Sequence, residues 1–318
     1  MIIKNAHTEP FWRFHRFHEE FDRNIKVTFG ALHLFSQSTF VEVGKASDLA
    51  ILPTGDEPWG EHTKWKDPKR VSGHAATFLS QMGLVRVMSA FEDFLVSVRA
   101  EHDRYLSLIG ATTKQSPKTR EEGDDDGGSL GQLFTQLGWS IDPIEFLVPL
   151  FDYLSLARNC IVHRSGRASE AFVKHAESPG LATCLSEWPS ARGKKLPLLP
   201  TVERDQEIPF LPRHSVLATD VCHRAAHHLN AKLASFLGKP GIVYMAAYHT
   251  LLADERIPTK AKNSAESLVN YALVGRYRIE DLNSTETVPI LKKLNRWSQC
   301  LRRFEELYPR AAHPKRRS

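Results

Sequence analysis

The longest stretch of regularly spaced apolar residues runs from Val71 to Ile109 and predicts a helix of that length. Apolar side chains recur along it every three or four residues, at Phe78, Met82, Val85, Met88, Phe91, Leu95 and Val98. A second row, formed by Leu84, Val87, Phe91 and Phe94, widens this stripe. A helix that is apolar over so much of its circumference is covered on two sides, so we expect it at the centre of a helical bundle.

The other segments complete the prediction of a mainly α-helical fold. Residues 1–65 mix aromatic with β-branched residues and predict a small lead-in that is partly β-stranded. Residues 66–238 predict a helical bundle with loops at 110–128 and 176–213, and residues 239–318 predict a separate helical module. The last helix of the bundle ends at Gly238, and its apolar face consists of Leu217, Val221, Ala225, Leu229 and Leu233.

Composition argues against several classes of protein. Of the 318 residues 42% are hydrophobic, which is enough for a sizeable core. No apolar run of about 18 residues and no secretory signal are present, so we expect a cytoplasmic protein that does not enter the membrane. The four cysteines lie far apart without a CxxC pair, which argues against a disulfide framework or a zinc site.

Positive charge is concentrated at the C-terminal end. The chain carries a formal net charge of +5, and residues 256–318 hold 14 Lys and Arg against 6 Asp and Glu. This asymmetry favours contact with a polyanion such as nucleic acid, and a solvated basic surface is the alternative. The same region loosely resembles a helix-turn-helix. Its candidate phosphate-binding side chains are Arg276, Arg278, Lys292, Lys293, Arg296, Arg302 and Arg303.

A helix predicted from Asp142 to Gly166 has an apolar face and a polar row. Pro149 is expected to kink this helix or to split it in two. The apolar face consists of Leu147, Leu150, Leu154, Ala157 and Ile161. The polar row consists of Asp152, Ser155, Asn159 and His163, with Arg158 at its edge.

Arg158, Asn159 and His163 have the chemistry needed for metal-free cleavage of RNA. Histidine can accept a proton from a ribose 2′-hydroxyl or donate one to the leaving oxygen. The arginine fork matches phosphate oxygens and stabilises transition-state charge, while asparagine can orient either partner. The structural alternative is that polar side chains at a helix C-terminus bond its last carbonyl groups and interact favourably with the helix dipole.

The string Arg158-Asn159-x-x-x-His163 resembles the signature of the HEPN superfamily, in which an arginine and a polar residue precede a histidine. The order of elements over roughly residues 70–238 is also similar to that of HEPN proteins. The resemblance implies a helical, usually dimeric fold and metal-independent ribonuclease activity in toxin–antitoxin, phage-defence or RNA-processing systems. Some HEPN members only bind, so a non-catalytic dimerisation or nucleic-acid-binding module is the alternative.

Residue by residue, the resemblance assigns Arg158 and His163 to the catalytic pair and Asn159 to the polar position. Glu92 lies in an FExFL phrase similar to that of many HEPN helices, and it either orients Arg158 or faces solvent. His223 and His227 are four residues apart, but no third metal ligand stands at a recognisable spacing. We therefore expect no metal and no cofactor.

The same chemistry predicts a homodimer. In-line cleavage benefits from a base and an acid on opposite sides of the phosphorus, and each chain offers one motif histidine. A two-fold axis beside His163 supplies the second histidine at a composite site. The expected partners are RNA, a second copy of the chain and an antitoxin or regulatory protein.

Overall fold

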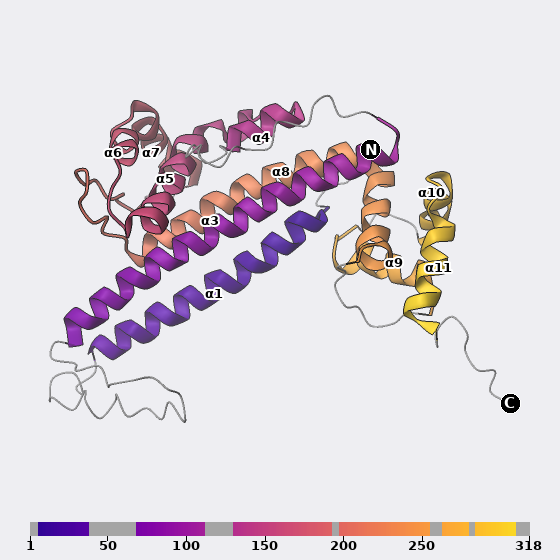
Figure 1. Ribbon diagram of the computed structural model, residues 1–318, viewed down its shortest axis with the longest axis horizontal. Coiled ribbons are helices and arrows are strands. Elements are labelled where there is room, and N and C mark those ends of the chain that lie inside the picture. Colours follow the sequence, from indigo (N-terminus) through magenta and orange to yellow (C-terminus); the bar gives the residue numbers. More distant parts are fainter. Residues whose placement is uncertain are drawn as a thin grey trace. The chain divides into compact units, whose positions relative to one another are not determined.

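The computed structural model describes residues 6–37, 68–111, 130–192, 197–254, 263–279 and 284–309. These residues are mainly helical, and their β-structure is limited to an isolated bridge between Arg167 and Glu207. Figure 1 labels the α-helices, which are α1 (Glu9–Gln37), α3 (Pro68–Leu108), α4 (Leu130–Leu137), α5 (Val148–Arg164), α6 (Glu170–Ala176), α7 (Pro179–Arg192), α8 (Pro212–Ala247), α9 (Ala265–Gly275), α10 (Thr287–Lys293) and α11 (Trp297–Leu307). A 3₁₀-helix precedes α5, a π-helix follows α8, and a 3₁₀-helix precedes α10 (Asp142–Leu147, Tyr248–Leu252 and Ser284–Glu286).

Contacts between residues divide the chain into two compact units. Unit 1 comprises residues 1–16, 91–145 and 223–318. Unit 2 comprises residues 17–90 and 146–222. The long helices α1, α3 and α8 each contribute residues to both units. The predicted domain boundaries at residues 65 and 238 stay a prediction, because the two units are defined by contacts between residues and do not show which parts of the chain fold independently.

The predicted long central helix is confirmed as α3, which runs from Pro68 to Leu108. Its second apolar row is buried, with Leu84, Val87 and Phe91 at 0% exposure. In the first row Met88, Phe91 and Val98 are buried and Leu95 is half-buried, whereas Phe78 is 59% exposed and Met82 is 40% exposed. The N-terminal part of α3 therefore carries apolar side chains that the described residues leave in contact with solvent.

The predicted β-structure in residues 1–65 is wrong for the part that the structure describes. Residues 9–37 form α1, and the stretch IKVTFGALHLF lies within it. Phe11, Phe14, Phe21 and Ile25 are buried and recur at helical spacing. Packing of this stripe overrides the strand preference of β-branched residues, which is the weaker signal. The remainder of the predicted β-segment, residues 38–65, lies outside the described residues.

Pro149 splits the predicted motif helix, as expected. A 3₁₀-helix covers Asp142–Leu147, and α5 begins at Val148 with the proline in its first turn, where a missing N–H costs no hydrogen bond. The predicted apolar face is confirmed, since Leu147, Leu150, Leu154, Ala157 and Ile161 are all buried.

The loop predicted at 176–213 is wrong for residues 179–192, which form α7. Leu181, Cys184 and Trp188 lie at helical spacing and are 2–3% exposed, so a buried stripe stabilises this helix. Pro179 is tolerated because it occupies the first helical position. The segment between Pro197 and Leu211 is irregular, as predicted. The loop predicted at 110–128 lies almost entirely outside the described residues.

The predicted face and end of the closing helix are confirmed in α8. Leu217, Val221, Ala225, Leu229 and Leu233 are buried. Gly238 has φ 55° and ψ −169°, so regular helix stops there and resumes beyond it. Such a conformation favours glycine because a Cβ atom disfavours positive φ.

The C-terminal part of unit 1 is helical, as predicted. Helices α9, α10 and α11 contact one another, and α9 and α11 also contact the π-helix. Asn295 has φ 56° and separates α10 from α11. All four cysteines are buried and not in disulfides, and burial raises the pKa of Cys184 and Cys300 to about 11, so their thiols stay protonated. Among the described residues no helix has the length and apolarity needed to cross a bilayer.

Candidate functional site

Arg158 and Asn159 are joined by a hydrogen bond in the C-terminal half of α5. Nη1 of Arg158 donates to Oδ1 of Asn159 over 2.9 Å, and both side chains are half-buried. His163 follows in the last turn of the helix with an exposed side chain. It makes no hydrogen bond or ion pair with any described residue. A guanidinium and an amide on adjacent residues thus precede a solvent-accessible imidazole by about one helical turn.

The backbone itself closes the end of α5. Ser165 is left-handed with φ 53°, and the following Gly166 has φ 80°. The N–H of Gly166 donates to the carbonyl oxygen of Cys160 over 3.0 Å, which is the bond expected when a helix ends in this conformation. Neither Asn159 nor His163 bonds a carbonyl group of the described residues. These two side chains are therefore not needed to cap the helix.

Gly166 also allows α3 to approach the end of the motif helix. A Cβ atom at this position would lie 2.9 Å from Nε2 of Gln81, which belongs to α3. The carbonyl oxygen of Gly166 accepts a hydrogen bond from the N–H of Ile208 over 3.0 Å. The turn after His163 is therefore held from two sides within unit 2.

The segment around Asp205 supplies further charge beside this turn. The N–H of Ala168 donates to the carbonyl oxygen of Gln206, and the N–H of Asp205 donates to that of Ala168, each over 2.9 Å. Nη2 of Arg164 pairs with Oδ1 of Asp205 at 2.5 Å, and Nη1 of Arg167 donates to the carbonyl oxygen of Asp205 over 3.0 Å. Both arginines are exposed, so these contacts contribute little stability. They do place two cations near His163 that the sequence analysis did not single out.

Asp152 is the first residue of the polar row, and His163 is the last. Burial raises the pKa of its carboxyl group, and the nearby positive charge of His175 partly opposes this rise. Nε2 of His175 lies 2.7 Å from the carbonyl oxygen of Pro149. At a rise of about 1.5 Å per residue, the eleven positions between Asp152 and His163 separate them along the axis by about 16 Å. Asp152 is therefore too far away to exchange a proton with His163.

Glu92 lies on α3 with an exposed side chain and belongs to unit 1. Its role in orienting Arg158, a residue of unit 2, stays a prediction.

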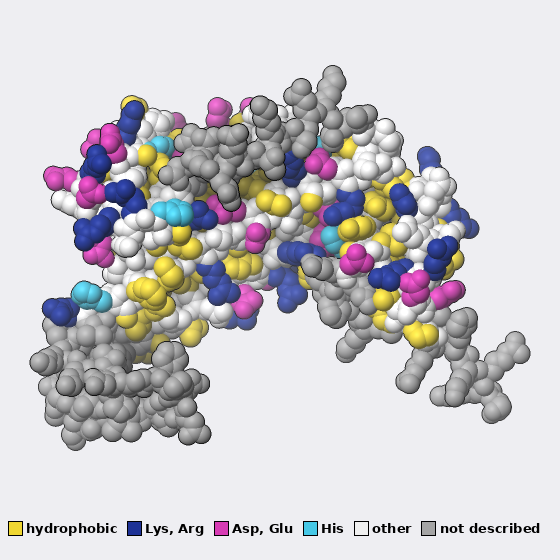
Figure 2. All heavy atoms as spheres, viewed as in Figure 1, with side chains coloured by type: hydrophobic (Ala, Val, Ile, Leu, Met, Phe, Trp, Pro, Cys, Tyr) yellow, Lys and Arg dark blue, Asp and Glu magenta, His cyan; other side chains and the backbone are white. Residues whose placement is uncertain are grey.

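The C-terminal cations fall into two groups. Arg276 is 9% exposed, and its Nη1 lies 3.3 Å from Oε2 of Glu9, so it does not present a free charge to a phosphate. Arg278, Lys292, Lys293 and Arg302 are exposed and have no ion pair among the described residues. Arg296 and Arg303 are half-buried, and each bonds a neighbour on its own helix. Figure 2 shows Lys and Arg over these C-terminal helices with Asp and Glu interspersed, so the surface is mixed rather than uniformly basic.

The histidines considered for a metal site lie in an aromatic cluster of unit 1. Nε2 of His223 is 3.1 Å from Nδ1 of His15, and the ring centroids of His223 and His227 are 4.6 Å apart. Phe11 contacts these rings, with its centroid 4.6 Å from that of His227. The described residues contain no group of three or more His, Cys, Asp or Glu that could hold a metal ion. Packing between rings accounts for these histidines.

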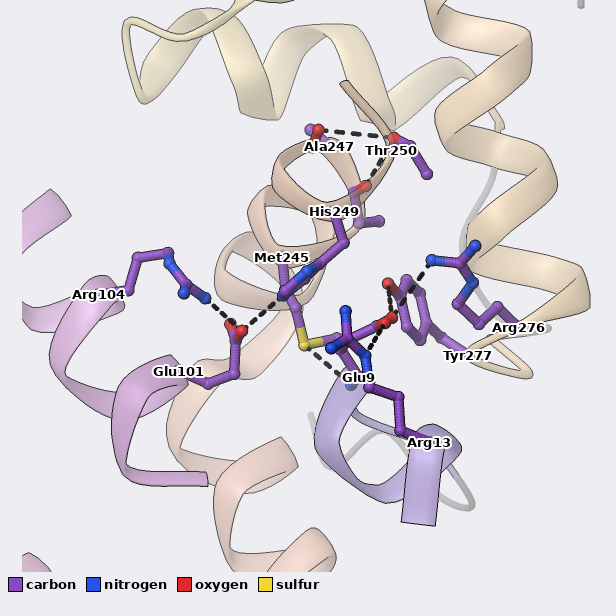
Figure 3. Close-up of polar contacts among 11 residues, drawn as sticks. Glu9, Arg13, Glu101, Arg104, Met245, Ala247, His249, Thr250, Arg276 and Tyr277 are labelled. Atoms are coloured by element: carbon purple, nitrogen blue, oxygen red, sulfur yellow. Dashed lines mark hydrogen bonds and ion pairs between the residues drawn. The ribbon is translucent and has the colours of Figure 1, made fainter. Parts of the chain in front are cut away.

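Unit 1 also contains two buried carboxylate networks that the sequence did not indicate, both drawn in Figure 3. Glu9 is 1% exposed and accepts from the hydroxyl of Tyr277 over 2.5 Å, besides pairing with Arg276. Glu101 is 4% exposed and pairs with Arg104 and with His249. The first network joins residues more than 260 positions apart, so no local pattern could have indicated it.

Each carboxylate is engaged by one side chain of its own helix and by side chains from a distant segment of the chain. Burial raises the pKa of Glu101, but the hydrogen bond and charge of His249, followed by those of Arg104, lower it below its ordinary value overall. Burial and the neighbouring Glu9 raise the pKa of Tyr277 well above its ordinary value. Figure 3 shows these groups pointing at one another, as expected for ion pairs that hold helices together.

Comparison of the chain with protein-family models, with curated proteins and with solved structures gives no significant match.

Proposed function

We propose that this chain is a metal-independent endoribonuclease of HEPN type. The observation that carries the proposal is the end of α5, where His163 is exposed beside a hydrogen-bonded Arg158–Asn159 pair while the backbone alone closes the helix. A helix that needed these residues only for its termination would use their polar atoms on its carbonyl groups. Asn159 and His163 do not do so among the described residues.

In the proposed reaction the ribose 2′-oxygen attacks the adjacent phosphorus. One histidine accepts the proton of the 2′-hydroxyl, and a second histidine donates a proton to the departing 5′-oxygen. The bond from phosphorus to the 5′-oxygen breaks, which leaves a 2′,3′-cyclic phosphate and a 5′-hydroxyl. Arg158 stabilises the charge on the phosphoryl oxygens in the transition state, and Asn159 holds the guanidinium in place.

The second histidine comes from a second copy of the chain. His163 is accessible, and its neighbour Val162 is 49% exposed, so an apolar side chain is also available for contact beside the imidazole. The exposed arginines at positions 164 and 167 and the exposed cations of α10 and α11 add attraction for the RNA backbone. A toxin or phage-defence context and an antitoxin partner follow from the HEPN resemblance alone.

The decisive experiment is RNA cleavage in excess chelator, with wild type compared with His163→Ala. We expect products ending in 2′,3′-cyclic phosphate from wild type and a loss of at least about 100-fold in the variant, the usual contribution of a positioned acid or base. His74→Ala is the matched control, because His74 is an exposed histidine of the same unit. Equal cleavage by wild type and His163→Ala, or no cleavage of any RNA tested, leaves the non-catalytic binding module as the better account.

A further inference from the structure

A small pocket lies between α1 and α3 within unit 2. Its volume is about 190 Å³. Its floor includes Phe21 and Ile25, which are 7% and 9% exposed, and the buried Gly83. Its rim carries the exposed polar side chains Glu20, Asn24 and Arg86, and the ring of Phe17 lies alongside.

The floor of the pocket is built by close packing. A Cβ atom at Gly83 would lie 3.1 Å from Oγ of Ser215 and 3.2 Å from Cδ1 of Ile25. The hydroxyl of Ser215 donates to the carbonyl oxygen of Ser80 over 2.6 Å, which ties α8 to α3 at this level. The glycine therefore lets side chains from α1 and α8 approach α3, and it gives the pocket a fixed base.

Size limits what the pocket can hold. Sites for drug-sized ligands enclose about 300–1,000 Å³, so this smaller volume suits one or two fused rings. An apolar floor beside the ring of Phe17 favours a planar occupant that can stack. The polar rim requires that this occupant carry hydrogen-bonding groups at its edge.

The rim offers a cation and an anion that the described residues leave unpaired. The guanidinium of Arg86 lies 5.9 Å from the centroid of the Phe17 ring, and no described carboxylate pairs with it. Glu20 likewise has no ion pair among the described residues. The side-chain amide of Asn24 makes no hydrogen bond there, since it is the backbone oxygen of Asn24 that accepts from Thr28. The rim can therefore accept hydrogen bonds, donate them and bind an anion.

We propose that this pocket binds a guanine base of single-stranded RNA, together with an adjacent phosphate. Guanine presents two neighbouring donors, N1–H and N2–H, which match the two oxygens of the Glu20 carboxylate. Its O6 accepts from the amide of Asn24, its ring stacks beside Phe17, and the phosphate pairs with Arg86. A purely apolar side chain from a protein partner would cover the same rim and leave those polar groups without partners.

This inference rests on the proposed ribonuclease function and adds base selection to it. Gln81, which contacts the end of the motif helix, is two positions from Gly83 and five from Arg86. At about 100° per residue these positions lie on roughly opposite sides of α3. The selected guanine is therefore not the nucleotide at the scissile phosphate but one further along the strand.

Calorimetric titration of the intact chain with GMP, AMP, CMP and UMP tests the proposal without any cleavage. We expect GMP to bind at least about fivefold more tightly than the other three, the lower limit for a bidentate base contact. Glu20→Gln removes one carboxylate oxygen and should abolish this preference. Arg86→Gln should weaken binding of GMP but leave binding of guanosine unchanged, because guanosine has no phosphate.

Matched variants separate this proposal from the ribonuclease proposal. Glu207→Gln and Arg23→Gln change exposed residues of unit 2 outside the pocket and should leave GMP binding unchanged. His163→Ala should abolish cleavage and leave GMP binding unchanged, so either function can fail alone. Equal binding of all four nucleotides, no binding of any, or an undiminished preference in Glu20→Gln overturns the guanine site. Displacement of GMP by indole at equal affinity in wild type and Glu20→Gln would also overturn it and assign the pocket to an apolar side chain.

Discussion

Gly166 provides a sharp test of how the motif helix is closed. An alanine there must adopt φ near 80°, a conformation that costs L-residues about 1–2 kcal/mol. Its Cβ atom would also meet Nε2 of Gln81 at 2.9 Å, but that atom is the end of a flexible side chain and can move. The backbone is held by hydrogen bonds to Cys160 and from Ile208, so it cannot easily relax. We expect Gly166→Ala to lower the free energy of unfolding by about 1–2 kcal/mol.

Urea unfolding followed by circular dichroism measures this loss, and a second substitution identifies its origin. Asparagine adopts left-handed conformations more readily than alanine, although it is larger. If backbone conformation dominates, Gly166→Asn is less destabilising than Gly166→Ala, and adding Gln81→Ala to Gly166→Ala restores little. The reasoning is refuted if asparagine is the more destabilising residue, or if Gln81→Ala restores most of the lost stability.

Three further predictions concern stability. Burial and nearby positive charge lower the pKa of His7 to about 4 in the folded chain, against 6.5 for the free residue. Between these pH values the unfolded chain binds more protons, so acidification from pH 6.5 to 4 should lower the free energy of unfolding by up to about 3 kcal/mol. His7→Phe should therefore flatten the pH dependence of urea unfolding. Glu9→Ala leaves the buried Arg276 without its carboxylate and should lower the free energy of unfolding by about 3–5 kcal/mol in the same assay. An unchanged urea midpoint would count against a structural role for this ion pair. Leu84→Ala should cost about 2–5 kcal/mol, whereas Phe78→Ala should change stability by less than about 0.5 kcal/mol, and similar costs for both would contradict the observed difference in burial.

Helices with a continuous apolar stripe and clear end signals were predictable from the sequence. The helix now seen as α3 was predicted within about three residues at each end, and Gly238 was predicted where regular helix stops in α8. Both predictions use local information, since spacing and glycine conformation depend only on neighbours along the chain. The predicted helix end near Gly166 was accurate for the same reason.

Elements with mixed local signals were assigned wrongly. Residues 9–37 contain β-branched and aromatic residues, yet they form α1 because Phe14, Phe21 and Ile25 can be buried together on one side of a helix. Residues 179–192 begin with a proline and were assigned to a loop, although Leu181 and Trp188 stabilise α7 through burial. Local propensity is worth less than the packing of such side chains, and packing is a property of the whole fold.

The candidate site likewise has features that follow from local sequence and features that depend on tertiary packing. By itself the sequence determined that Arg158, Asn159 and His163 share one end of a helix, because helical spacing is a local rule. Only the tertiary structure decided that His163 is exposed, that Asp205 joins the arginines at positions 164 and 167 beside it, and that Arg276 is committed to Glu9. The pocket formed by Glu20, Phe21 and Arg86 could not be predicted either. Each of these features depends on which distant segments pack together, and that choice is made by burial of apolar surface across the whole chain.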